Sequence, residues 1–194
     1  MTRTFIALQL DESLQGFLGE IIRRMVRELP GLRWVDPAGI HLTLAFLGEL
    51  DDQQLAEATQ AAELSTRLIP SFEYRLSHPG IFGSPRQPRV IWIGVEEPSG
   101  NLQLLHHQLN LELAQRGFEI DTRPFSPHLT LARIKAPLKL EEQQHLQRLL
   151  AEQDRQAFSP PVRVRYLSVM KSELLRAGAR YTSLKDVPLG LDKG

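Results

Sequence analysis

Apolar residues recur along this chain with two periods, one typical of strands and one typical of helices. The run from Phe5 to Leu10 is short and mostly apolar, as expected of a buried strand. From Asp11 onward the apolar residues follow a helical spacing, and Pro30-Gly31 ends this segment. The helical face consists of Leu14, Phe17, Leu18, Ile21, Ile22, Met25 and Val26. The pattern therefore predicts a strand followed by an amphipathic helix.

The same criteria divide the rest of the chain into strands and helices. Further strands are predicted at residues 34–35, 40–47, 72–76, 90–95, 128–134, 162–170 and 181–184. Further helices are predicted at residues 51–68, 101–116 and 140–153. Glycine and proline interrupt residues 77–88, and we expect this segment to be a loop.

The order of these elements repeats. A strand, a helix, a strand and a helix around position 41 have counterparts around position 128, 87 residues further on. This spacing is too long for a solenoid and suits a duplicated half-domain. The prediction is an α+β fold in a single domain spanning residues 1–194. It would be bilobal, with two pseudo-symmetric lobes of mainly antiparallel sheet flanked by helices around a central cleft.

Two identical tetrapeptides occupy corresponding places in the repeat. They are His41-Leu42-Thr43-Leu44 and His128-Leu129-Thr130-Leu131. Each lies in a predicted strand, where successive side chains point to opposite faces. Histidine and threonine therefore share one face of each strand, and the leucines point into the core.

Two imidazoles beside two hydroxyls suit the cleavage of a cyclic phosphodiester. That reaction takes a proton from attacking water and gives one to the departing sugar oxygen, on opposite sides of phosphorus. Imidazole, with a pKa of about 6.5, can do either near neutral pH. His41 and His128 are thus the predicted acid–base pair. The hydroxyls of Thr43 and Thr130 are the predicted donors to the phosphoryl oxygens.

Composition narrows the choice of ligand and cofactor. Lysine plus arginine and aspartate plus glutamate both total 23, so no net positive charge is available to hold long nucleic acid. One RNA terminus or a small nucleotide needs only a few local cations. Cysteine is absent, and no metal-binding motif is evident, so we expect neither metal nor cofactor. No apolar stretch approaches the roughly 18 residues of a membrane helix, so we expect a cytoplasmic protein without membrane contact.

These motifs resemble the two-histidine phosphoesterases, and within them the RNA 2′,3′-cyclic phosphodiesterases, also known as 2′-5′ RNA ligases. The similar segments cover nearly the whole chain and comprise residues 3–7, 33–35, 41–48, 88–92, 125–133 and 167–172, with Gly178 and Tyr181. The resemblance implies a bilobal fold with a central cleft and hydrolysis of a 2′,3′-cyclic phosphate to a 2′-phosphate; the absence of metal-binding motifs predicts that no metal takes part. RNA termini or small cyclic nucleotides would be the substrates, and 2′-5′ ligation would be the reverse reaction.

The resemblance also implies individual roles. His41 would be the general acid on the leaving 3′ oxygen, and His128 the general base toward water. Phe125 would stack on the terminal base, and Arg133 would lie near the phosphate. A monomer is expected.

Some of these residues also have ordinary structural explanations. Phe125 suits packing of its loop against the core, and Arg133 suits a solvated strand face. Neighbouring residues of a helix point about 100° apart, so His106 and His107 are not expected to face one ligand.

Two other functions fit the same motifs. One is a phosphodiesterase for 2′-5′ linkages or for another small cyclic phosphate, such as ADP-ribose 1″,2″-cyclic phosphate. The other is an RNA-end binding module that recognises the terminus without cleaving it.

Overall fold

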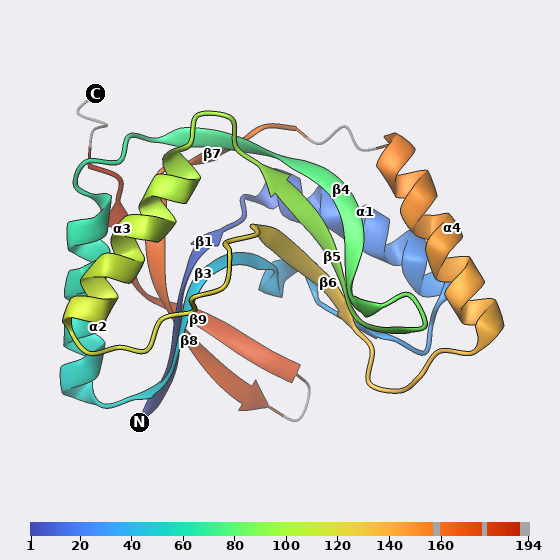
Figure 1. The fold of residues 1–194 in the computed structure, drawn as a ribbon, viewed down its shortest axis with the longest axis horizontal. Helices are drawn as coiled ribbons and strands as arrows, with labels where there is room; N and C mark the ends of the chain where they lie inside the picture. The colour runs from blue at the N-terminus through green and yellow to red at the C-terminus, as the bar shows by residue number, and fades with distance from the viewer. Residues whose placement is uncertain (157–159, 176–177, 191–194) are drawn as a thin grey trace.

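Strands and helices alternate through residues 1–156, 160–175 and 178–190, which the computed structural model describes (Figure 1). The strands are β1 (Thr2–Gln9), β2 (Arg33–Trp34), β3 (His41–Leu50), β4 (Phe72–Ser84), β5 (Gln87–Glu96), β6 (His128–Arg133), β7 (Val162–Val164), β8 (Tyr166–Leu175) and β9 (Gly178–Pro188). The helices are α1 (Glu12–Glu28), α2 (Asp52–Thr66), α3 (Asn101–Gln115) and α4 (Leu140–Gln156), with a short 3-10 helix η1 (Pro37–Gly39).

The strands form two antiparallel sheets, one in each half of the molecule. One has the order β3-β1-β8-β9 and the other the order β2-β6-β5-β4-β7. Helices α2 and α3 lie beside the four-stranded sheet, and α1 and α4 lie on the side of the five-stranded sheet (Figure 1). The predicted α+β fold, with mainly antiparallel sheets flanked by helices, is confirmed.

Capping residues in the sequence account for the observed ends of three helices. Asp11 accepts a hydrogen bond from the backbone N–H of Leu14 at the start of α1. Asp51 and Gln54 form a reciprocal capping box at the start of α2. Gly117, with a φ of 80°, follows α3 in the left-handed conformation that glycine adopts without strain.

The two sheets approach one another at β3 and β6 and share one core. Cα atoms of β3 lie within 8 Å of Cα atoms of β6. A single cluster of buried side chains includes Leu42 and Leu44 of β3 together with Leu129 and Leu131 of β6. Both motif strands are therefore held by the same apolar interior.

The motif strands also share an irregularity. The register of β3 against β1 shifts at Leu44, and the register of β6 against β5 shifts at Leu131. Such a bulge adds one residue and changes which face the following side chains occupy. Phe46 and Arg133, each five residues after a motif histidine, are consequently exposed rather than buried in the core.

The predicted loop at residues 77–88 is wrong, because this segment forms a hairpin between β4 and β5. Ser84 pairs with Gln87, and Gly80 pairs with Trp92. The ladder accommodates Pro79 through a register shift between Leu76 and Pro79. The glycine and proline that suggested a loop are instead features of a strand, so the prediction of a loop for His78 is wrong as well.

The predicted single strand at residues 162–170 is also wrong. It consists of two strands that belong to different sheets: β7 pairs with β4, whereas β8 pairs with β1 and β9. The chain passes from one sheet to the other at Arg165, which lies between them. The closing strand predicted at residues 181–184 is longer and extends over Gly178–Pro188.

We predict that Gly80→Ala destabilises the protein. A Cβ atom at this position would overlap the indole ring of Trp92. Overpacking of this kind costs about 1–3 kcal/mol, and urea unfolding would show it as a lower midpoint. Gly16→Ala on α1 is the matched control, because its Cβ would meet nothing within 4 Å and alanine favours a helix by about 0.5–1 kcal/mol. An unchanged midpoint for Gly80→Ala would contradict the packing described.

Candidate active site

His41 is the first residue of β3 and is held on three sides. Its Nδ1 lies 2.9 Å from the carbonyl oxygen of Gly39. Its ring stacks on Phe5 of β1, with centroids 4.5 Å apart, and meets the ring of Tyr181 of β9 edge-on at 4.8 Å. The imidazole therefore has a defined orientation in a largely apolar setting.

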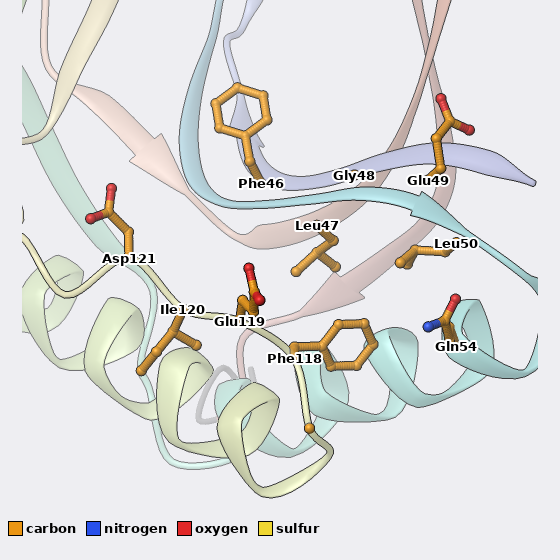
Figure 2. A pocket seen from close by; sticks show the side chains of 11 residues that line it. Phe46, Leu47, Gly48, Glu49, Leu50, Gln54, Phe118, Glu119, Ile120 and Asp121 are labelled. Atoms are coloured by element: carbon orange, nitrogen blue, oxygen red, sulfur yellow. The ribbon is translucent and has the colours of Figure 1, made fainter.

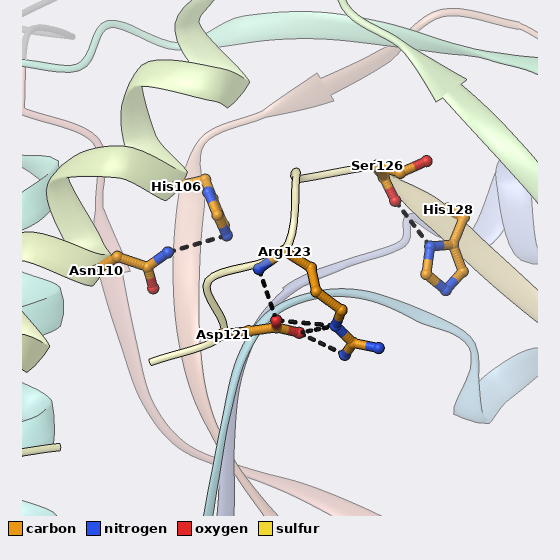
Figure 3. A network of polar contacts seen from close by, with 6 residues as sticks. All are labelled: His106, Asn110, Asp121, Arg123, Ser126 and His128. Atoms are coloured by element: carbon orange, nitrogen blue, oxygen red, sulfur yellow. Dashed lines mark hydrogen bonds and ion pairs between the residues drawn. The ribbon is translucent and has the colours of Figure 1, made fainter. Parts of the chain in front are cut away.

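His128 is the first residue of β6 and is held in a corresponding way. Its Nδ1 lies 2.8 Å from the carbonyl oxygen of Ser126 (Figure 3). The ring of Phe82 meets it edge-on at a centroid distance of 4.8 Å, and the ring of Trp92 lies 6.2 Å away. Each motif histidine thus faces a carbonyl two residues before it and packs against two aromatic rings.

The contacts with the backbone carbonyls determine which nitrogen of each imidazole ring can exchange a proton with a ligand. A carbonyl oxygen can only accept a hydrogen bond, so Nδ1 of each ring carries the proton in that bond. In the neutral form, Nε2 is then the basic nitrogen. Both histidines therefore present the same atom for proton transfer.

The threonines lie beside the histidines as the strand pattern predicted. His41, Thr43, His128 and Thr130 are partly exposed, whereas the intervening leucines are buried. The exposed fractions of those leucines are 1% for Leu42, 5% for Leu44, 0% for Leu129 and 1% for Leu131. Each strand thus presents an imidazole and a hydroxyl on one face.

The surroundings of His41 change its proton affinity. Burial lowers the pKa of His41 from its ordinary value of 6.5, because the charged ring loses water. The hydrogen bond to the Gly39 carbonyl acts in the opposite direction and only partly offsets burial. The unliganded protein therefore favours the neutral form of this ring.

Arg133 lies at the end of β6 and is exposed. Because of the bulge at Leu131, its side chain returns to the face of β6 that carries His128 and Thr130. It lies directly opposite Arg33 of β2 and Val90 of β5 in the sheet.

Phe125 is partly buried and stacks on His106 of α3, with ring centroids 3.8 Å apart and planes 7° from parallel. Nε2 of His106 lies 3.2 Å from the side-chain amide nitrogen of Asn110 (Figure 3). His106 thus supports the loop before β6, while His107 on the same helix is exposed. One face of the Phe125 ring is already occupied, so a nucleobase could stack only on the other.

The same loop contains an exposed ion pair. Arg123 donates hydrogen bonds to the carboxylate of Asp121 at 2.9 Å from Nε and 2.5 Å from Nη2 (Figure 3). These bonds lower the pKa of Asp121 to about 2. The positive charge of Arg123 is therefore compensated locally.

A pocket of about 480 Å³ lies next to the end of β3, away from the motif histidines. Phe46–Leu50, Gln54 and the segment 117–121 line it (Figure 2). Its rim carries the exposed carboxylates of Glu49 and Glu119, while that of Asp121 is paired with Arg123. An acidic pocket disfavours a phosphate ester, so the histidine pair is the better candidate for phosphoester chemistry.

Sequence reasoning missed the rings that surround the histidines. Phe5 and Tyr181 come from other strands of the four-stranded sheet, and Phe82 lies in the segment that was predicted to be a loop. Phe5 could have been found from its place in the first apolar run, but its contact with His41 depends on how β1 pairs with β3.

Within the described residues, no group of three or more His, Asp or Glu side chains is arranged to hold a metal ion. None of the helices in that part of the chain is both long and apolar enough to cross a membrane.

Comparisons of this chain with known proteins all indicate the same family. The model of the 2′-5′ RNA ligase superfamily matches residues 12–174. An RNA 2′,3′-cyclic phosphodiesterase of Thermotoga maritima is 37% identical over 133 residues, which are 69% of this chain and 70% of the relative. One from Methanothermobacter thermautotrophicus is 31% identical over 183 residues, which are 94% of this chain and 96% of the relative.

Solved structures agree with the sequences. A crystal structure of TT0787 of Thermus thermophilus has a TM-score of 0.76 and 29% identity, and covers 97% of this chain and 98% of its own. Escherichia coli LigT complexed with 3′-AMP has a TM-score of 0.70 and 27% identity, with the same coverage. The resemblance carried by the motif residues is confirmed, and the chain belongs to the 2′-5′ RNA ligase superfamily.

Proposed function

We propose that this protein hydrolyses 2′,3′-cyclic phosphates at RNA ends to 2′-phosphates, without a metal ion, and that His41 and His128 transfer the protons. The observation that carries the proposal is the matched pair of His-x-Thr strands, one from each sheet, with the same Nδ1 hydrogen bond behind each imidazole. The relatives named RNA 2′,3′-cyclic phosphodiesterase support the choice of substrate.

Two proton transfers balance the reaction. Nε2 of His128 takes a proton from water as the water oxygen bonds to phosphorus. The bond between phosphorus and the 3′ oxygen breaks, and that oxygen takes a proton from Nε2 of His41. The products are a 2′-phosphate and a 3′-hydroxyl, and each transfer typically contributes about 10² to 10⁴ in rate.

The acid role of His41 requires its protonated form, which burial disfavours in the free protein. An anionic phosphate beside the ring raises the pKa again, because an opposite charge stabilises the imidazolium. Binding of the substrate would therefore favour the protonated form of His41, which is the form that can act as the acid. With the roles reversed and His41 as the base, the neutral form would be required, and its pKa would not need to rise on substrate binding.

The threonines and Arg133 complete the proposed site. The hydroxyls of Thr43 and Thr130 lie on the faces of their own histidines and would donate to the phosphoryl oxygens. Arg133 adds positive charge on the His128 face of β6. Phe125 would offer its remaining ring face to the terminal base. We further propose a monomer that acts in the cytoplasm.

Replacement of either histidine should abolish most of the activity. We expect His41→Ala and His128→Ala each to lower kcat about 10² to 10⁴-fold on RNA ending in a cyclic phosphate, with EDTA present throughout. His107→Ala is the control, because this residue is exposed on α3. Resolving the product as 2′- or 3′-phosphate checks which bond breaks. Wild-type rates in both histidine variants, or loss of activity in EDTA, would contradict the proposal.

The threonines can be tested with a variant of nearly the same shape. Thr43→Val and Thr130→Val each remove one hydroxyl donor and should lower kcat about 10² to 10³-fold, as loss of an oxyanion donor does. The binding of a product 2′-phosphate should change much less than kcat. If kcat stayed at the wild-type value while the fold was intact, the hydroxyls would have no role in the transition state.

The pKa of His41 provides a third test. NMR titration of the free protein should place it below 6.5, and Tyr181→Ala should raise it toward 6.5 by admitting water to the ring. Tyr166→Ala, on an exposed residue of β8, is the control. If His41 is the acid, kcat/KM falls as pH rises through this pKa, whereas it falls with decreasing pH if His41 is the base. A pKa at or above 6.5 in the free protein would contradict the burial argument.

A further inference from the structure

We infer that His106 of α3 is a positioning residue for His128, one of the two histidines that transfer protons in the proposed reaction. The imidazole of His106 holds the ring of Phe125, and Phe125 in turn fixes the neighbouring backbone carbonyl that orients His128. This inference rests on the proposed function. It gives a role in that reaction to a helix that contributes no residue to the two motif strands.

The carbonyl behind His128 belongs to an irregular segment of the chain. Residues 118–127, between α3 and β6, contain neither helix nor strand. Within the described part of the chain, no hydrogen bond between two backbone groups involves residues 119–126. The backbone joins the five-stranded sheet at Pro127, whose carbonyl oxygen accepts a hydrogen bond from the N–H of Val95 at 3.1 Å. The Ser126 carbonyl is therefore not fixed by a helix or by a ladder of strands.

The carbonyl behind His41 is held in a different way. Gly39 belongs to the 3-10 helix η1, and its N–H donates a hydrogen bond to the carbonyl oxygen of Asp36 at 2.8 Å. Local backbone hydrogen bonds thus fix the Gly39 carbonyl. For His128, side-chain contacts have to supply the same constraint.

Phe125 connects the irregular segment to α3. Its ring is partly buried against the main core and lies parallel to the ring of His106, with centroids 3.8 Å apart. Ser126 follows directly, and a residue before proline is restricted to extended backbone conformations. The Ser126 carbonyl is therefore placed by the Phe125 ring on one side and by Pro127 on the other.

The ion pair in the same segment cannot do this. Arg123 and Asp121 both belong to the segment, so their contact does not attach it to the rest of the protein. Both side chains are also exposed, and exposed ion pairs hold a loop only weakly. The stack on His106 is thus the contact that ties Phe125 to a regular element.

His106 is itself held in one orientation. Asn110, one turn further along α3, places its amide nitrogen 3.2 Å from Nε2 of the ring (Figure 3). An amide N–H can only donate, so this bond requires a neutral imidazole that accepts at Nε2. Burial lowers the pKa of His106, because the charged ring loses water, and this favours the neutral form.

The position of the Ser126 carbonyl affects the chemistry of His128 directly. A neutral imidazole can carry its proton on either nitrogen. The bond of 2.8 Å from Nδ1 to this carbonyl keeps the proton on Nδ1 and leaves Nε2 free to accept one (Figure 3). If the carbonyl moves, the ring can turn and the proton can occupy Nε2. Both changes reduce the rate of proton transfer without removing a contact with the substrate.

The kinetic test compares two apolar replacements of His106. His106→Phe keeps a flat ring that can stack on Phe125, whereas His106→Leu does not. On RNA ending in a 2′,3′-cyclic phosphate, kcat should fall about 10-fold in His106→Leu, because a misplacement of about 1 Å can cost up to 10²-fold in rate. KM should change little, and His106→Phe should retain most of the wild-type kcat. His107→Leu is the matched control, because this neighbouring residue is exposed on the same helix.

A spectroscopic measurement tests the same contact without substrate. Nitrogen-15 NMR at alkaline pH reports which ring nitrogen of His128 carries the proton. We expect Nδ1 in the wild type, in His106→Phe and in His107→Leu. In His106→Leu, the form with the proton on Nε2 should become populated. Melting temperatures of the variants are measured alongside, and the assays are run below the lowest of them.

The outcomes distinguish this inference from the proposed function. Equal kcat values in His106→Leu and His106→Phe would overturn the positioning role while leaving the hydrolysis in place. A rise in KM with an unchanged kcat would also overturn it, because His106 would then support only the binding of the substrate. Absence of turnover by the wild-type protein would count against the proposed function. In that case, an unchanged proton position on His128 in His106→Leu would overturn the inference on its own.

Discussion

The burial of leucine on alternate positions determines the direction in which both histidines point. In each motif strand the leucines enter a core that the two sheets share, and the period of two leaves the imidazole and hydroxyl on the opposite face. Full burial of a leucine contributes about 1.5–3 kcal/mol, and a slip of one residue in either motif strand would turn its two leucines outward. Apolar packing, rather than contacts of the histidines themselves, therefore decides the orientation of the site.

The two motif histidines nevertheless have different surroundings in the two sheets. His41 stacks on Phe5 with the ring planes 29° apart, while His128 makes a T-shaped contact with Phe82. Burial in this apolar setting lowers the pKa of His41. The proposed acid and base are one residue type, and different surroundings are the means by which such a pair can be given different roles.

Much of this arrangement could be predicted from the sequence, because it depends on local periodicity. The four helices, the two motif strands and the shared face of histidine and threonine follow from spacing alone. The hairpin at residues 77–88 could not, since its glycines and proline favour a loop, and the close approach of Gly80 to the ring of Trp92 appears only once β4 pairs with β5. The division of residues 162–170 between two sheets, and the position of Arg33 opposite Arg133, depend on pairing partners far away in the chain. The stacking of Phe125 on His106 has the same origin, and so do the rings around both histidines.

The position of β8 between β1 and β9 has a consequence for how the chain folds. Phe5 pairs with Met170, so the centre of the four-stranded sheet joins residues from opposite ends of the sequence. Contacts of such long range require closure of a large loop before they stabilise anything, and they slow folding. During synthesis on the ribosome, the edge of β1 that pairs with β8 stays unpaired until β8 has left the ribosome. The sheet that carries His41 would therefore be the last to consolidate, and a chain shortened before β8 would leave β1 as an open edge prone to aggregation.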